Sequence, residues 1–226
     1  MSGQRQKIFR FIYWSGLVFC LVALCSGVGC SNGILRTKSD LRKGWVCDKE
    51  ADEAMQRQDH ETGILLHERF LAKEPTNGLA WYHLGYAYGQ TGDHLKEVLH
   101  YEKAIALGFK GDHVFFNLGM AYGELNQIEK ACDAFKKAIA LNPDNADNHF
   151  GLAMAYQRSS IDKLAEEAFL KAIEIDPGHV GARLYLSMLY TDMGDLQRAR
   201  KHLHKILEID PTHTAARMFL EKIEQE

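Results

Sequence analysis

The four prolines of this chain recur at a fixed spacing. Pro143, Pro177 and Pro211 lie 34 residues apart, and Pro75 lies two such periods before Pro143. A repeat of about 20–50 residues is typical of arrays in which each unit buries its apolar face only against its neighbours. The period therefore restricts the chain to a repeat architecture before any other feature is considered.

Frames that place each proline at position 32 run 44–77, 78–111, 112–145, 146–179 and 180–213. Equivalent positions then carry similar residues: position 7 is leucine, position 11 is tyrosine, position 24 is large and apolar, and positions 8, 20 and 27 are mostly small. The large residues are Leu84, Leu118, Leu152 and Leu186 at position 7, Tyr88, Tyr122, Tyr156 and Tyr190 at position 11, and Tyr101, Phe135, Phe169 and Leu203 at position 24.

This spacing predicts two amphipathic helices in each frame. An α-helix has about 3.6 residues per turn, so positions 4, 7, 8 and 11 share one face, as do positions 20, 24 and 27. The turn between the helices falls near position 15, where Gly92, Asn126, Ser160 and Gly194 stand. Gly, and to a lesser degree Asn, accept a left-handed backbone. The predicted fold class is all-α.

One segment carries a family signature directly. Trp81-Tyr-His-Leu84-Gly85-Tyr-Ala-Tyr88 resembles the W-x2-L-G-x2-Y signature of the tetratricopeptide repeat (TPR), and Phe115 to Tyr122 matches it with Phe in place of Trp. The resemblance covers roughly residues 44–226. It implies a solenoid of about five helix-turn-helix repeats that binds a protein or peptide and carries out no catalysis.

The ends of the array depart from the pattern. Frame 44–77 keeps Pro75 and a plausible turn at Gln58-Asp59, but it has Cys47, Glu50 and Ala54 at signature positions, so we interpret it as a degenerate first repeat. Residues 214–226 begin another first helix and are predicted to cap the last repeat.

Frame 78–111 has two internal departures. Glu97 stands where a small residue is expected, and Phe109 stands where the proline is expected. Both departures predict a looser helix contact in this repeat.

The N-terminus has the pattern of a targeting segment. Residues 1–10 carry Arg5, Lys7 and Arg10 and no acidic residue, and residues 11–29 carry no charge. A basic start, an apolar run and small residues are typical of a secretory signal. Cys30 directly after Gly29 resembles the lipobox of bacterial lipoproteins, in which the cysteine is lipidated and becomes the mature N-terminus. Residues 30–43 are then interpreted as a tether.

Two alternatives remain for this segment: an uncleaved membrane anchor and an ordinary cleaved signal. The 19 uncharged residues could just span a bilayer. All three interpretations place the repeats in the bacterial cell envelope, on the periplasmic side. In bacterial lipoproteins, an aspartate directly after the lipidated cysteine resembles a signal for retention in the inner membrane. This chain has Ser31 at that position, which weakly favours the outer membrane.

Charge and cysteine spacing exclude several function classes. The formal net charge is −3, and three positive charges lie within residues 1–29. The remainder is therefore more acidic still, which argues against nucleic acid as a partner. Cys47 and Cys132 lie two repeats apart, too far for a disulfide within one molecule. No C-x-x-C spacing is present.

The histidines are not spaced as a catalytic metal site. No pair brackets a glutamate as in H-E-x-x-H, and no G-x-S-x-G elbow or phosphate-binding glycine loop occurs. The sequence predicts no enzyme, no cofactor and no metal site.

The resemblance implies that positions 2, 5, 9, 12 and 13 of each first helix line a concave groove. Positions 5 and 9 are apolar or aromatic in four successive repeats, where a solvated groove would be polar, and this predicts an apolar ligand, either an amphipathic helix or an extended segment. The predicted groove residues are Tyr82, Tyr86, Phe116, Met120, Phe150, Met154, Leu184 and Met188, and the predicted rim residues are His113, Glu124, Arg158 and Asp192.

Three functional interpretations stay open at this point. The first is a membrane-anchored interaction scaffold, similar to TPR lipoproteins such as the pilotins of secretin and pilus assembly. The second is a self-associating solenoid whose groove closes a homodimer, since the same residues could be buried against a second copy. The third is an accessory subunit of an envelope polysaccharide or peptidoglycan enzyme complex.

Overall fold

The computed structural model describes residues 46–224. The predicted signal segment at 1–29, Cys30 and the whole predicted tether at 30–43 fall outside the described residues, so these assignments stay predictions. Among the described helices, none is both long and apolar enough to cross a bilayer.

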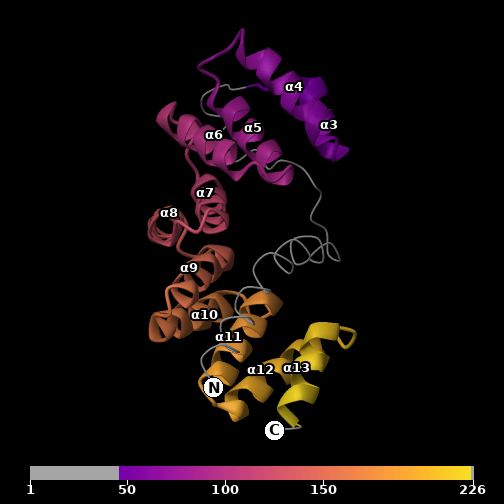
Figure 1. The fold of residues 1–226 in the computed structure, drawn as a ribbon, viewed down its shortest axis with the longest axis vertical. Helices are drawn as coiled ribbons and strands as arrows, with labels where there is room; N and C mark the ends of the chain where they lie inside the picture. Colours follow the sequence, from indigo (N-terminus) through magenta and orange to yellow (C-terminus); the bar gives the residue numbers. More distant parts are fainter. Residues whose placement is uncertain (1–45, 225–226) are drawn as a thin grey trace, which may run out of the picture. The chain divides into compact units, whose positions relative to one another are not determined.

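The described part of the chain forms eleven α-helices and no strand, which confirms the all-α prediction (Figure 1). Two helices fall in each 34-residue frame, and one follows the last frame. In chain order they are α3 (Lys49–Gln56), α4 (His60–Leu71), α5 (Gly78–Gln90), α6 (His94–Ala106), α7 (Asp112–Glu124), α8 (Ile128–Leu141), α9 (Ala146–Arg158), α10 (Asp162–Ile175), α11 (Val180–Asp192), α12 (Leu196–Ile209) and α13 (Thr214–Glu224).

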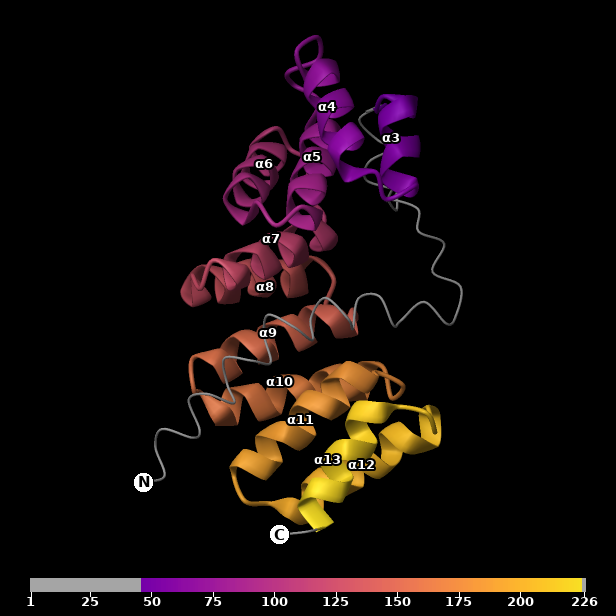
Figure 2. The same ribbon diagram turned by 45° about the vertical axis from the view of Figure 1, so that its right-hand side comes forward.

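Each helix packs against the next one along the chain, from α3 through α13, as Figure 2 shows from a second side. The first helices of successive repeats also contact one another, α5 with α7, α7 with α9, and α9 with α11. Such nearest-neighbour stacking is the defining arrangement of a solenoid. The α13 helix buries Ala216 and Ile223 against the array, as expected of a cap.

The turn at position 15 is left-handed in all five frames, as predicted. Gln58, Gly92, Asn126, Ser160 and Gly194 have φ values of 61°, 82°, 57°, 58° and 80°. At each turn, the next residue's N–H returns to the carbonyl near the end of the first helix; Asp195 N–H, for example, donates to Tyr190 O at 2.8 Å. This is a Schellman motif, which satisfies carbonyls that the helix end leaves open.

Frame 78–111 has no proline, and its second helix, α6, ends at a glycine turn instead. Gly108 takes φ 90°, and Phe109 N–H donates to Ala104 O at 2.9 Å, again as a Schellman motif. Phe109 then turns inward and is almost fully buried against Tyr82 and His113. The helix stop that proline supplies elsewhere is supplied here by glycine.

A large residue of the second helix packs against a small residue of the first. The four position-24 side chains, Tyr101, Phe135, Phe169 and Leu203, are fully buried. A Cβ atom added to Gly119 would lie 2.8 Å from the Phe135 ring, and one added to Gly151 of the next repeat would lie 2.4 Å from it. The Phe135 ring therefore fills space that two glycines leave, one on each side.

The looser contact predicted for frame 78–111 is wrong. The α5 and α6 helices contact each other as extensively as the helix pairs of the next two repeats. Glu97 is buried, its carboxylate accepts from His94 Nδ1 at 2.8 Å, and a Cβ on Gly89 would lie 2.4 Å from Glu97 Oε1. Gly89 makes room for the larger side chain, and burial raises the pKa of the Glu97 carboxyl.

Two histidines at position 34 act as helix caps. His179 Nδ1 accepts from Ala182 N–H at 2.9 Å, and His213 Nδ1 accepts from Ala216 N–H at 3.1 Å. Asn77 does the same for α5 with its side-chain oxygen. A side-chain acceptor at this position satisfies an N–H that the first turn of a helix leaves open.

Opposite substitutions at two turns test the left-handed geometry. Gly194→Ala is expected to lower the free energy of unfolding by about 1 kcal/mol, because an L-residue strains a left-handed backbone. The added methyl group meets nothing within 4 Å, so the loss is a backbone effect. Ser160→Gly is expected to raise the free energy of unfolding by about 0.5–1 kcal/mol, because glycine adopts the left-handed backbone without strain. The greater freedom of glycine in the unfolded chain offsets part of this gain. Urea denaturation measures the free energy of unfolding of both variants. If both variants were stabilised, or both destabilised, the left-handed geometry of the two turns would be contradicted.

Candidate binding groove

The first helices of successive repeats lie next to one another along the stack. The α5, α7, α9 and α11 helices contact one another in succession in addition to contacting their own second helices. Positions 5 and 9 lie one helical turn apart on each of them, so they form one face. This face is where the sequence places the predicted groove.

The eight predicted groove residues differ in exposure. Tyr82, Met154 and Leu184 are buried, with only 8%, 2% and 2% of their surface exposed. The expectation that the apolar stripe is uncovered is wrong for these three, because neighbouring helices cover them. The other five are half-buried: Tyr86, Phe116, Met120, Phe150 and Met188.

The aromatic residues at position 5 take part in packing between helices. The Phe116 ring meets the Phe135 ring edge-on at 5.7 Å between centroids. The Phe150 ring lies 4.9 Å from the His179 ring and 5.5 Å from the Tyr185 ring. Phe150 thus joins α9 to the start of α11 while part of its ring stays accessible.

Three of the five half-buried groove residues stand at position 9. Met120 and Met188 are half-buried on α7 and α11, and Tyr86 is half-buried on α5 with an edge contact to His60. Burial raises the pKa of the Tyr86 phenol, so it remains protonated at neutral pH. The available groove is therefore narrower than the sequence predicted, and its role in partner binding stays a prediction.

The rim residues have different surroundings. Arg158 donates to Gly123 O at 3.1 Å and to Asn126 Oδ1 at 2.9 Å, which fixes its guanidinium on the end of α7. His113 stacks edge-on against Tyr82. Glu124 is half-buried and Asp192 is exposed. The arginine of the rim is thus bonded to the neighbouring repeat.

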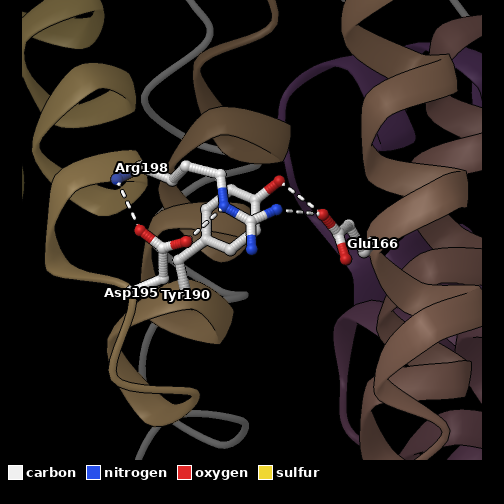
Figure 3. Close-up of polar contacts among 4 residues, drawn as sticks. All are labelled: Glu166, Tyr190, Asp195 and Arg198. Carbon is white, nitrogen blue, oxygen red and sulfur yellow. Dashed lines mark hydrogen bonds and ion pairs between the residues drawn. The ribbon is translucent and has the colours of Figure 1, made fainter.

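A recurring polar contact joins successive repeats at the tyrosine of position 11. Its hydroxyl donates to a glutamate on the second helix of the preceding repeat, and a cation of its own second helix lies over its ring. In Figure 3, Tyr190 donates to Glu166 Oε1 at 2.8 Å and the Arg198 guanidinium lies 4.2 Å from the ring centroid. Arg198 also donates to Glu166 at 2.6 Å and to Asp195 at 2.5 Å.

Two other repeats show the same contact. Tyr88 donates to Glu68 at 2.7 Å beneath Lys96, and Tyr122 donates to Glu102 beneath Lys130. We call this arrangement the tyrosine clasp. Burial, followed by the hydrogen bond that Tyr190 donates to Glu166, raises the pKa of Tyr190 to about 12, so the phenol stays a donor at neutral pH. The sequence showed the tyrosines but not their acidic partners.

The fourth tyrosine departs from this pattern. Lys136 stands 20 residues before Tyr156, at the position that Glu68 and Glu102 occupy relative to their tyrosines, and its ammonium group lies 5.9 Å from the ring centroid. Leu164 replaces the cation of the second helix. The junction between α8 and α9 is therefore joined by apolar packing on Phe135 instead of a tyrosine clasp.

A buried cluster of possible metal ligands was missed by the sequence reasoning, which predicted no metal site. Cys47, Asp52, His67 and His83 each bring one ligand atom within 4.8 Å of all the others. Burial, with His83 nearby, lowers the pKa of His67 to about 4, so its imidazole is neutral at pH 7. No short motif reveals this cluster, because the four residues lie on separate elements. The only signal was that Cys47 and His67 both belong to the repeat that departs most from the pattern.

Comparison with known sequences gives the family. Tetratricopeptide repeat families match residues 49–109, 119–160, 146–179 and 163–223. The chain belongs to the tetratricopeptide repeat family, whose members serve as protein–protein interaction scaffolds. No curated protein matches the chain significantly.

Solved structures share the fold. MamA is 26% identical with a TM-score of 0.68, over 74% of this chain and 97% of that one. MamA from Desulfovibrio magneticus RS-1 is 19% identical with a TM-score of 0.68, over 79% and 98% of the two chains. YrrB, described as a TPR protein with an unusual peptide-binding site, is 22% identical with a TM-score of 0.64, over 76% and 88%.

The departure at Tyr156 provides a matched control for the tyrosine clasp. Tyr190→Phe is expected to lower the free energy of unfolding by about 1–2 kcal/mol, because a hydrogen bond to a carboxylate is lost. Tyr156→Phe is expected to change it by less than about 0.5 kcal/mol. Chemical denaturation of both variants measures the difference, and equal losses would show that the hydroxyl–glutamate bond contributes little.

Proposed function

We propose that this chain is an interaction scaffold held at a bacterial envelope membrane by its N-terminal segment. Its partner is a protein with an apolar segment, either an amphipathic helix or an extended strand. The segment binds along the inner side of the stack, over the first helices α7, α9 and α11.

The observation that carries this proposal is the half-buried apolar face of the first helices. Met120 and Met188 are unbranched and adaptable, which suits a surface that accepts an apolar side chain. The accessible edges of Phe116 and Phe150 supply rigid aromatic area beside them. Accessible apolar side chains that gather on one face of a soluble protein are typical of a binding surface.

The rim chemistry supports an apolar ligand over a terminal carboxylate. A carboxylate clamp needs basic and amide side chains free to point into the groove. Arg158 is instead bonded to Gly123 and Asn126, and Asn117 Nδ2 donates to the Tyr82 hydroxyl at 3.0 Å. Glu124 and Asp192 add negative charge at the same edge, which would repel a carboxylate.

YrrB shares this fold and is described as having an unusual peptide-binding site, which agrees with a peptide as the kind of partner. The membrane anchor rests on the basic start, the uncharged run and Cys30. Assembly of envelope machinery such as a secretin or a pilus is the use that this architecture suggests; it rests on analogy, and no comparison supports a pilotin resemblance.

Charge in the groove tests the binding face. The double variant Met120→Lys with Met188→Lys places two ammonium groups where an apolar segment would dock, and we expect at least a tenfold loss of affinity, or about 1.4 kcal/mol. Met154 is a poor target, because its side chain is buried and a lysine there would unfold the repeat. Leu99→Lys, on the exposed face of α6, is the matched control.

The readout is capture of an envelope protein by the wild-type chain, followed by its affinity for each variant. Circular dichroism shows that the variants remain helical. Unchanged capture by the folded double variant contradicts the groove. Sizing separates the alternatives: a wild-type dimer that becomes a monomer in the double variant identifies the face as a homodimer contact, and a captured synthesis enzyme indicates an accessory subunit.

Labelling with a radioactive fatty acid tests the anchor. A lipoprotein is expected to incorporate the label in cells, and Cys30→Ser is expected to abolish incorporation. A chain that stays in the membrane fraction without label in both forms has an uncleaved anchor instead.

A further inference from the structure

The N-terminal end of the array holds four side chains whose donor atoms converge. Cys47 precedes α3, Asp52 lies on α3, His67 lies on α4, and His83 lies on α5. One ligand atom from each lies within 4.8 Å of all the others. His67 and His83 are 0% and 1% exposed, and Cys47 is also buried.

The imidazoles of this cluster are not fully satisfied by the protein around them. Nε2 of His67 and Nε2 of His83 are buried and have no hydrogen-bond partner among residues 46–224. Two contacts cross the cluster: Cys47 Sγ lies 3.8 Å from His67 Nδ1, and His83 Nδ1 lies 3.0 Å from Asp52 Oδ1. Nδ1 of His83 is likewise buried without a hydrogen-bond partner in the described part of the chain, and it faces the Asp52 carboxylate. Buried polar atoms normally have a partner, and a cation held in the cluster would supply one to the Nδ1 atoms that face it.

We propose that Cys47, Asp52, His67 and His83 bind a single structural zinc ion. Thiolate, imidazole and carboxylate groups are each zinc ligands, and four of them together complete a tetrahedral site. Zinc–nitrogen and zinc–sulfur bonds of about 2.0 and 2.3 Å place tetrahedral donors about 3.3–3.5 Å apart. The two cross-cluster distances, 3.0 and 3.8 Å, lie on either side of this spacing.

The charges also balance. A Cys47 thiolate and an Asp52 carboxylate together carry two negative charges, which neutralise a divalent cation. A neutral site is the form of a buried metal that costs least to remove from water. When the ion binds, the thiol proton is released to solvent, and both imidazoles coordinate in their neutral form.

The position of the site explains how the degenerate first repeat can hold its place. Frame 44–77 lacks the tryptophan, leucine and tyrosine of the signature and has Cys47, Glu50 and Ala54 at these positions. A zinc ion bound by α3, α4 and α5 would join the first repeat to the second in place of those apolar contacts. The ion would act as an N-terminal cap, as α13 does at the opposite end.

Metal titration of the full chain tests this proposal. The chain is prepared without a histidine tag, reduced, freed of metal with a chelator and titrated with zinc and with cobalt(II). We expect one ion per chain, with the visible bands of tetrahedral cobalt and a thiolate-to-cobalt charge-transfer band. Zinc at about 100 times its dissociation constant should raise the melting temperature by about 5–10 °C.

Three variants assign the ligands. Cys47→Ser, and the isosteric Asp52→Asn in case the first does not fold, should each weaken zinc binding at least about 100-fold. Cys132→Ser replaces the other buried cysteine of the described repeats and should bind zinc as the wild type does. Circular dichroism confirms that each variant is helical.

Two outcomes overturn the proposal. One is a folded wild-type chain that binds no zinc, in which case the cluster is a set of internal hydrogen bonds only. The other is binding that persists unchanged in folded Cys47→Ser and Asp52→Asn, which would place the ion elsewhere, for example on Cys20, Cys25 or Cys30.

Discussion

The structure depends on the close approach of a large side chain to a small one at each helix pair. Phe135 shows this most clearly, because Gly119 of its own repeat and Gly151 of the next both leave room for its ring. A Cβ at either glycine would force the helices apart, since cores are packed without spare volume. These residues recur with the 34-residue period, and the first helices from α5 to α11 contact one another in succession.

The same packing restricts the candidate groove. Phe116 and Phe150 contribute to contacts between helices and leave only part of their rings accessible. Met120 and Met188 remain as adaptable side chains between them. The groove is thus built from residues that also stabilise the solenoid. A variant that tests binding must therefore change the accessible residues Met120 and Met188 and leave the buried Met154 in place. The tyrosine clasps stabilise three junctions without using this face.

Much of the fold could be predicted because its determinants are local and repeated. The turn residues, the small and large positions and the cap all follow from one register, since each depends on neighbours within about one period. Two expectations failed for a common reason. Gly89 accommodates Glu97, and neighbouring helices cover Tyr82 and Leu184. Both outcomes depend on contacts between residues of different helices. The periodicity of the sequence does not show which of these residues come into contact.

The sequence by itself determined the helix pairs, their left-handed turns and the membership of the TPR family, because short-range propensity and a fixed period act along the chain. Only the tertiary structure decided which apolar residues remain accessible, which glutamate each tyrosine meets, and that Cys47, Asp52, His67 and His83 converge. These outcomes depend on how helices from different repeats pack. Side-chain direction across such a contact is set by the helix geometry in space and not by spacing along one helix.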